Sequence, residues 1–160
     1  MKKIFIFPLI VSAMVLMLFT VGCKKSDSLS ETWNWKGTAY TATTCSLTTS
    51  GAAGYGTSNT LNVQDGSTIL SVIFNGPLPT TSQTDTVVAW GGSVDATQVT
   101  INLAVNGNTY QSTGGNGANQ TINVTVSNGV VTAVASSAVE LLNIASGSVD
   151  SSGVTFSVVQ

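Results

Sequence analysis

Residues 98–113, QVTINLAVNGNTYQST, indicate the fold more directly than any other part of the sequence. Val99, Ile101, Leu103 and Val105 alternate with Thr, Asn and Ala, which is the period of a β-strand with one buried face. Asn106-Gly107 follows immediately, and both central residues of a type I′ turn have a positive φ, which Asn and Gly tolerate best. This stretch therefore predicts a β-hairpin that joins strands 98–105 and 108–113.

The same pattern recurs elsewhere in the chain. Asn128-Gly129 joins predicted strands 121–127 and 130–136, and Asp65-Gly66 joins 60–64 and 68–75, with Ser67 as a further residue of that loop. Further strands are predicted at 32–43, 84–90, 139–144 and 154–159, although a helical turn is an alternative for 139–144. Clusters of Gly, Pro, Ser and Asn predict loops at 48–57, 76–83 and 114–118.

About ten short strands joined by tight turns define an all-β class. The prediction is one domain, residues 32–160, built as an antiparallel β-sandwich, with an up-and-down, lipocalin-like β-barrel as the alternative. Two short matches, 36–43 with 106–113 and 60–63 with 121–124, favour two similar sheets, while coincidence is the other explanation in a chain rich in Thr, Asn and Gly.

The N-terminus has the order of a secretory signal peptide. Lys2 and Lys3 are followed by a run from Ile4 to Val21 that is apolar apart from Ser12 and Thr20. A run of this length could also span a bilayer as a permanent helix, so an uncleaved anchor is the alternative.

The end of the run, Thr20-Val21-Gly22-Cys23, resembles the lipobox of bacterial lipoproteins, and the resemblance covers residues 1 to about 28. It implies cleavage between Gly22 and Cys23, a lipid on the Cys23 sulfur, acylation of the new amino terminus, and a place in the bacterial cell envelope at the outer membrane. Residues 1–22 are then the signal peptide and 23–31 a lipidated tether. Two or three acyl chains hold such a protein stably on a membrane.

The other cysteine, Cys45, is expected to have no partner if Cys23 carries lipid, and to behave as a small buried apolar side chain. The chain contains no histidine and no arginine, which excludes triads with a histidine base. Beyond Glu31 the one cation is Lys36, so no basic surface exists for nucleic acid, and the formal net charge is −2. No metal-ligand pattern and no cofactor motif are present, so neither a metal nor a cofactor is expected.

Carboxylates are scattered singly through the domain, which disfavours a glycan-active enzyme that would use two of them: Glu31, Asp65, Asp85, Asp95, Glu140 and Asp150. Two tripeptides, around Ser28 (Asp27-Ser28-Leu29) and Thr86 (Asp85-Thr86-Val87), resemble the O-glycosylation motif of envelope proteins in some diderm bacteria.

These features predict a non-enzymatic cell-envelope lipoprotein with a binding or scaffolding role. Its partners would be the membrane, through the lipid on Cys23, and an envelope protein or glycan. The first alternative is a lipocalin-like carrier of a small apolar ligand, although Trp33-Asn34-Trp35-Lys36-Gly37 reverses the lipocalin order of Gly before Trp. The less favoured alternatives are a surface adhesin and the carboxylate-based enzyme.

Overall fold

The computed structural model describes residues 20–22, 31–52, 56–89, 95–114 and 120–160. They form strands and turns, and among them no helix is long and apolar enough to cross a membrane. The strands are β1 (Thr20–Gly22), β2 (Thr32–Trp35), β3 (Thr38–Thr41), β4 (Thr44–Ala52), β5 (Gly56–Asp65), β6 (Thr68–Phe74), β7 (Gln83–Val87), β8 (Gln98–Val105), β9 (Asn108–Ser112), β10 (Thr121–Ser127), β11 (Val130–Asn143) and β12 (Val149–Val159).

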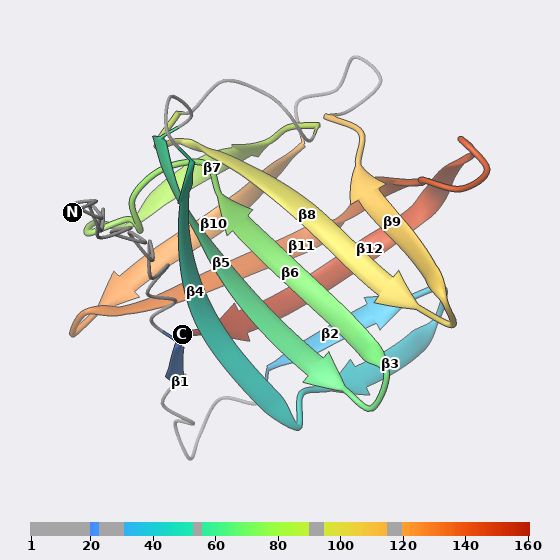
Figure 1. The fold of residues 1–160 in the computed structure, drawn as a ribbon, viewed down its shortest axis with the longest axis horizontal. Helices are drawn as coiled ribbons and strands as arrows, with labels where there is room; N and C mark the ends of the chain where they lie inside the picture. The colour runs from blue at the N-terminus through green and yellow to red at the C-terminus, as the bar shows by residue number, and fades with distance from the viewer. Residues whose placement is uncertain (1–19, 23–30, 53–55, 90–94, 115–119) are drawn as a thin grey trace, which may run out of the picture.

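All strands belong to one sheet that folds over into two layers. The hydrogen-bonded order is β1-β4-β5-β6-β8-β7-β10-β11-β12-β2-β3, and β9 pairs with both β8 and β11. Figure 1 shows β4, β5, β6 and β8 crossing in front of β10, β11 and β12. The all-β sandwich prediction is confirmed, with one difference: the described pairs are antiparallel except for β7 and β8, which are parallel.

The core fills the space between the two layers. The alternating residues Val99, Ile101, Leu103 and Val105 are all buried, as the period of the sequence predicts. They pack with side chains from the other layer, including Trp33, Ile122 and Leu141, in one continuous cluster. Each fully buried side chain of this size contributes roughly 1.5–3 kcal/mol through the hydrophobic effect.

The predicted Asn-Gly turns are confirmed by their backbone angles. Asn106 and Gly107 have φ of 51° and 75°, and Asn128 and Gly129 have 53° and 77°. Lys36 and Gly37 adopt the same conformation, with φ of 52° and 78°. The prediction of one strand over 32–43 is therefore wrong: a tight turn at Lys36-Gly37 divides it into β2 and β3, because Gly37 tolerates the positive φ that the turn requires.

The Asp65 turn also differs from the prediction. Asp65 is the last residue of β5 and pairs with Thr68, so Gly66 and Ser67 form the loop between β5 and β6. Of the two loop residues, Gly66 has a φ of 56° and lies in the left-handed region, whereas Ser67 does not. In each Asn-Gly turn, both central residues lie in that region.

The predicted loop at 48–57 is wrong, because β4 continues to Ala52 and β5 begins at Gly56. Side-chain hydrogen bonds across the two strands replace the missing apolar contacts. The Thr49 hydroxyl donates to Asn59 Oδ1 at 2.7 Å, and the hydroxyls of Ser50 and Ser58 are 2.9 Å apart. Thr and Ser pairs of this kind stabilise a sheet even where the residues resemble a loop in composition.

Of the predicted strand 139–144, residues 139–143 are confirmed as strand, and they continue the predicted strand 130–136 within β11, whereas Ile144 lies in the following turn. The register against β12 shifts between Ala135 and Val139, so β11 contains a β-bulge. On either side of this bulge β11 pairs with different neighbours, with β10 before it and with β9 after it.

Candidate functional site

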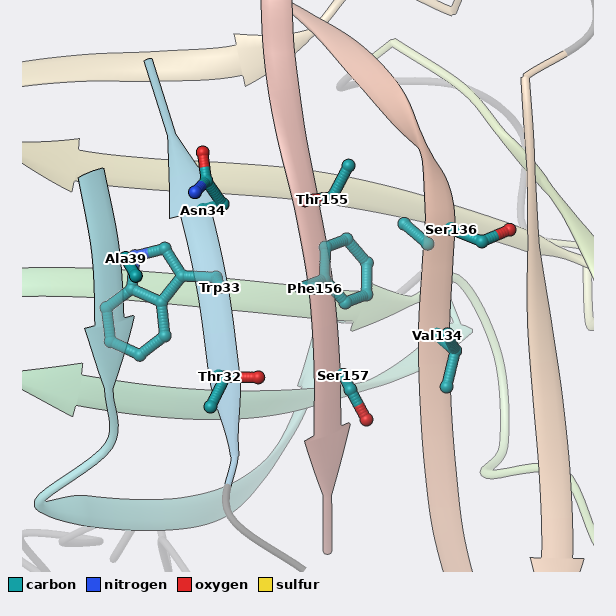
Figure 2. Close-up of a pocket in the computed structure, with 10 residues that line it drawn as sticks. Thr32, Trp33, Asn34, Ala39, Val134, Ser136, Thr155, Phe156 and Ser157 are labelled. Atoms are coloured by element: carbon teal, nitrogen blue, oxygen red, sulfur yellow. The ribbon is translucent and has the colours of Figure 1, made fainter. Parts of the chain in front are cut away.

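An open groove of about 360 Å³ crosses the outer face of β3, β2, β12 and β11. Figure 2 shows these strands side by side with the side chains that line the groove. The lining residues are Thr32, Trp33, Asn34, Ala39, Val134, Ala135, Ser136, Thr155, Phe156 and Ser157.

Alternation along the strands builds this surface. In β2, Trp33 and Trp35 are buried while Thr32 and Asn34 lie on the outer face, and in β12 Phe156 is buried while Thr155 and Ser157 lie outside. The register places Thr32 opposite Ser157 and Asn34 opposite Thr155. Hydroxyl and amide groups from two strands that are distant in the sequence therefore face the same groove.

Two of the lining residues, Trp33 and Phe156, are buried, and their rings belong to the core on the inner side of the sheet. Trp33 pairs with Phe156 across the two strands, and its ring stacks on Tyr40 with centroids 5.2 Å apart. The indole Nε1 of Trp33 is buried and has no hydrogen-bond partner in the described part of the chain. Because this indole lies in the core, a ligand in the groove on the outer face of the sheet does not reach it.

The bulge in β11 adjoins the groove. Ala135 lines the groove and is the last residue before the register shift. On β12, Gly153 has a φ of 60°, and a Cβ atom there would lie 2.7 Å from the Val139 carbonyl oxygen. Glycine thus allows β12 to approach the bulge closely.

A charged and aromatic cluster lies beyond the groove. Lys36 forms a salt bridge with Asp150 and lies 5.3 Å from the centroid of Trp35, which packs against Tyr110. The hydrogen bond to Asp150 raises the pKa of Lys36. Partial burial favours the neutral form of Asp150, but hydrogen bonds from Lys36 and Ser152 outweigh it and lower the pKa of that carboxyl. This network uses Lys36, the one cation of the domain, in a structural contact.

Asp85 and Asp95 have opposite pKa shifts, which is the arrangement of an acid and base pair. Burial raises the pKa of Asp85, and the backbone and hydroxyl of Thr97 lower that of Asp95 by donating to its carboxylate. However, the Asp85 side chain is 0% exposed, with one oxygen held by Gln83 and the other without a partner among the described residues. A substrate in solvent cannot reach this carboxyl.

The other predicted carboxylates do not come together in the groove. Asp65 accepts a long hydrogen bond from the Thr41 amide at 3.4 Å, and neither Glu31 nor Glu140 lines the groove. Within the ranges that the structure describes, no three His, Cys, Asp or Glu side chains form a cluster that could hold a metal ion.

The predicted modification sites are placed only in part. Gly22 is the last residue of β1, while Cys23 and Ser28 lie outside the described residues. Thr86 is half-buried in β7, between β10 and β8, where its neighbours are Thr121 and Gln98.

Cys45 corrects another prediction. It is disulfide-bonded, so the expectation of a cysteine without a partner is wrong for this structure. The sequence contains one other cysteine, Cys23, which lies outside the described residues. The expectation depended on lipid at Cys23, whose sulfur cannot carry a lipid and a disulfide at the same time.

The groove was not predicted from the sequence. Its residues come from segments 32–39, 134–136 and 155–157, and each segment alone has the alternation of an ordinary half-buried strand. The one local signal is that the outward positions of 155–157 are Thr and Ser rather than charged residues.

Comparisons with known proteins give no further indication: no protein-family model matches the chain, and no curated protein or solved structure matches it either.

Proposed function

We propose that this protein is a lipid-anchored protein of the bacterial cell envelope, without enzymatic activity, whose β-domain binds an uncharged polar partner. The observation that carries the anchor is the sequence: a basic start, an apolar run, and Gly22-Cys23 at its end. In the proposed mature protein the first strand of the sheet would be β2, which begins at Thr32, and residues 23–31 would serve as the tether between lipid and domain.

The groove supports the binding role. Its volume of about 360 Å³ lies within the range of ligand sites, and its lining includes the hydroxyl and amide groups of Thr32, Asn34, Thr155 and Ser157. No titratable side chain is among its lining residues, so the groove itself has no group for acid or base catalysis. These groups match the hydroxyls of a glycan, and we propose an envelope glycan as the partner.

The carrier alternative has less support. A lipocalin-like carrier holds its ligand between the layers, and in this protein buried side chains such as Trp33, Phe74 and Leu103 fill that space. The groove on the outer face is open to solvent, whereas a site for a small apolar molecule is usually enclosed.

Mass spectrometry of the protein purified from bacterial membranes tests the anchor. The proposal predicts an N-terminus at Cys23 with the mass of a diacylglyceryl thioether and an added acyl chain. The same sulfur cannot carry this lipid and form a disulfide with Cys45, so the two states are distinguished in one spectrum. A chain that begins at Met1, with its two cysteines joined, would refute the proposal.

A further inference from the structure

Among the residues that the structure describes, one edge of the sheet is covered only by β1, which the proposed processing removes. β4 pairs along its whole length with β5 on one side, and on the other side with β1 through Thr20↔Thr48, Val21↔Leu47 and Gly22↔Ser46. Cleavage between Gly22 and Cys23 would remove β1 completely. In Figure 1, β4 lies at the edge of its layer.

The vacated edge is long and has no feature that prevents pairing. β4 runs over 9 residues, which corresponds to about 30 Å of backbone. Its sequence, TCSLTTSGA, contains neither a charge nor a proline, the two features with which exposed edges usually avoid contact with other strands. The opposite end of the sheet, β3, has only 4 residues, and its Thr41 amide donates to Asp65 Oδ2 at 3.4 Å.

The pairing with β1 shows what the edge accepts. It accepts an antiparallel segment whose central residue, Val21, lies opposite Leu47. The sequence of β1 is Thr-Val-Gly, and the centre of β4 is Ser46-Leu47-Thr48. Both tripeptides consist, in the same order, of a small hydroxyl residue, an aliphatic residue and a small residue. A β4 strand from a second copy, centred on Leu47, would present the same order in the same direction.

From this geometry we propose that the mature protein forms a homodimer through antiparallel pairing of β4 with β4 of a second copy, about a two-fold axis at Leu47. This inference rests on the proposed function, because the edge is vacated only by cleavage before Cys23. Two copies tethered to one membrane meet at a high effective concentration, which favours a contact made by main-chain hydrogen bonds. In this register Thr44 lies opposite Ser50 of the second copy, and Ser50 opposite Thr44.

The register offers a test with a matched control. Thr44 and Ser50 are both exposed and lie on the same face of β4. The variant Thr44→Lys/Ser50→Lys places like charges opposite each other at both pairs, whereas Thr44→Lys/Ser50→Glu places opposite charges there. Both variants change the same two positions, so the effect of the substitutions on folding is similar, and circular dichroism checks that both fold.

The experiment is analytical ultracentrifugation of the processed, lipidated protein in detergent, after mass spectrometry has established its N-terminus. We expect a dimer for the wild type, at least roughly tenfold weaker association for the Lys/Lys variant, and restored association for the Lys/Glu variant. The charge comparison also separates true pairing from two chains that share a micelle.

The outcomes distinguish this inference from the proposed function. A correctly processed wild type that stays monomeric overturns the dimer and leaves the lipoprotein proposal standing. Equal association of the Lys/Lys and Lys/Glu variants overturns this register and the dimer with it. An unprocessed chain overturns both proposals, because β1 then still covers β4.

Discussion

Gly153 is the position where a single methyl group is expected to cause a large loss of stability. An alanine Cβ would lie 2.7 Å from the Val139 carbonyl oxygen and 3.0 Å from the Ala138 Cβ, and the φ of Gly153 is 60°. The left-handed conformation costs an alanine roughly 1–2 kcal/mol relative to the right-handed region. Forcing backbone atoms apart in a packed bulge costs roughly a further 1–3 kcal/mol. We expect Gly153→Ala to lower the free energy of unfolding by roughly 2–5 kcal/mol in total.

Gly147 provides the control for Gly153. Its φ is 68°, and a Cβ at this position would meet nothing within 4 Å, so Gly147→Ala carries only the conformational cost of roughly 1 kcal/mol. Urea denaturation followed by tryptophan fluorescence measures both variants, and a thermal melt should show a shift of roughly 3 °C for each kcal/mol. Equal losses for the two variants would refute the argument that the close approach of β12 to the bulge needs glycine.

Three further substitutions test the site and the core. Asp85→Asn should raise the free energy of unfolding at pH 7 by roughly 1 kcal/mol, since it removes a buried charge without a full set of partners. Burial raises the folded-state pKa of Asp85, so the wild type is stabilised by the protonated carboxyl in acid and loses this stability as pH rises through that pKa. The difference in free energy of unfolding between Asp85→Asn and the wild type should therefore shrink as pH falls. A difference that does not change with pH would contradict this reasoning. Thr155→Trp should fill the groove and abolish cosedimentation with purified peptidoglycan sacculi. The control Thr125→Trp changes an outward-facing position outside the groove and should leave cosedimentation unchanged. A wild-type protein that fails to cosediment counts against a glycan of this kind. Leu141→Ala should lower the free energy of unfolding, measured by chemical denaturation, by roughly 2–5 kcal/mol because the Leu141 side chain is 0% exposed. Leu142→Ala, at the half-buried neighbouring position, should lower it by less than half as much. Similar losses for the two variants would contradict the assignment of Leu141 to the core.

The hairpins that the sequence predicted correctly are those whose turn chemistry is local. Asn106-Gly107 and Asn128-Gly129 adopt the positive φ values that their residue types favour, and the alternating strands beside them have the expected buried faces. The turn at Lys36-Gly37 has the same geometry, but lysine carries no such preference, so the sequence was interpreted as one strand over 32–43. The match of 36–43 with 106–113 was used only to favour two similar sheets, although it aligns Lys36-Gly37 with the turn at Asn106-Gly107.

Errors occurred where a partner strand, rather than local sequence, determines the structure. The segment 48–57 has the composition of a loop, but Thr49 and Ser50 find hydroxyl and amide partners on β5 and the strands extend. The bulge in β11 is likewise set by its neighbours, since β11 pairs with β10 before the bulge and with β9 after it. Neither feature can be derived from a window of sequence that contains only one of the two strands.

The two parts of the proposed function differ in the same way. The proposed lipid attachment rests on a short contiguous segment that ends at Gly22-Cys23, so it can be proposed without any knowledge of the fold. The groove depends on the register that sets Trp33 opposite Phe156, which joins a strand near the start of the domain to one at its end. The edge of β4 depends on both, because the sequence defines where the chain would be cut and the sheet order defines which strand that cut uncovers. Processing at the N-terminus would therefore change the surface of the folded domain as well as attach it to the membrane, and the association of Lys/Lys and Lys/Glu variants at Thr44 and Ser50 measures that change directly.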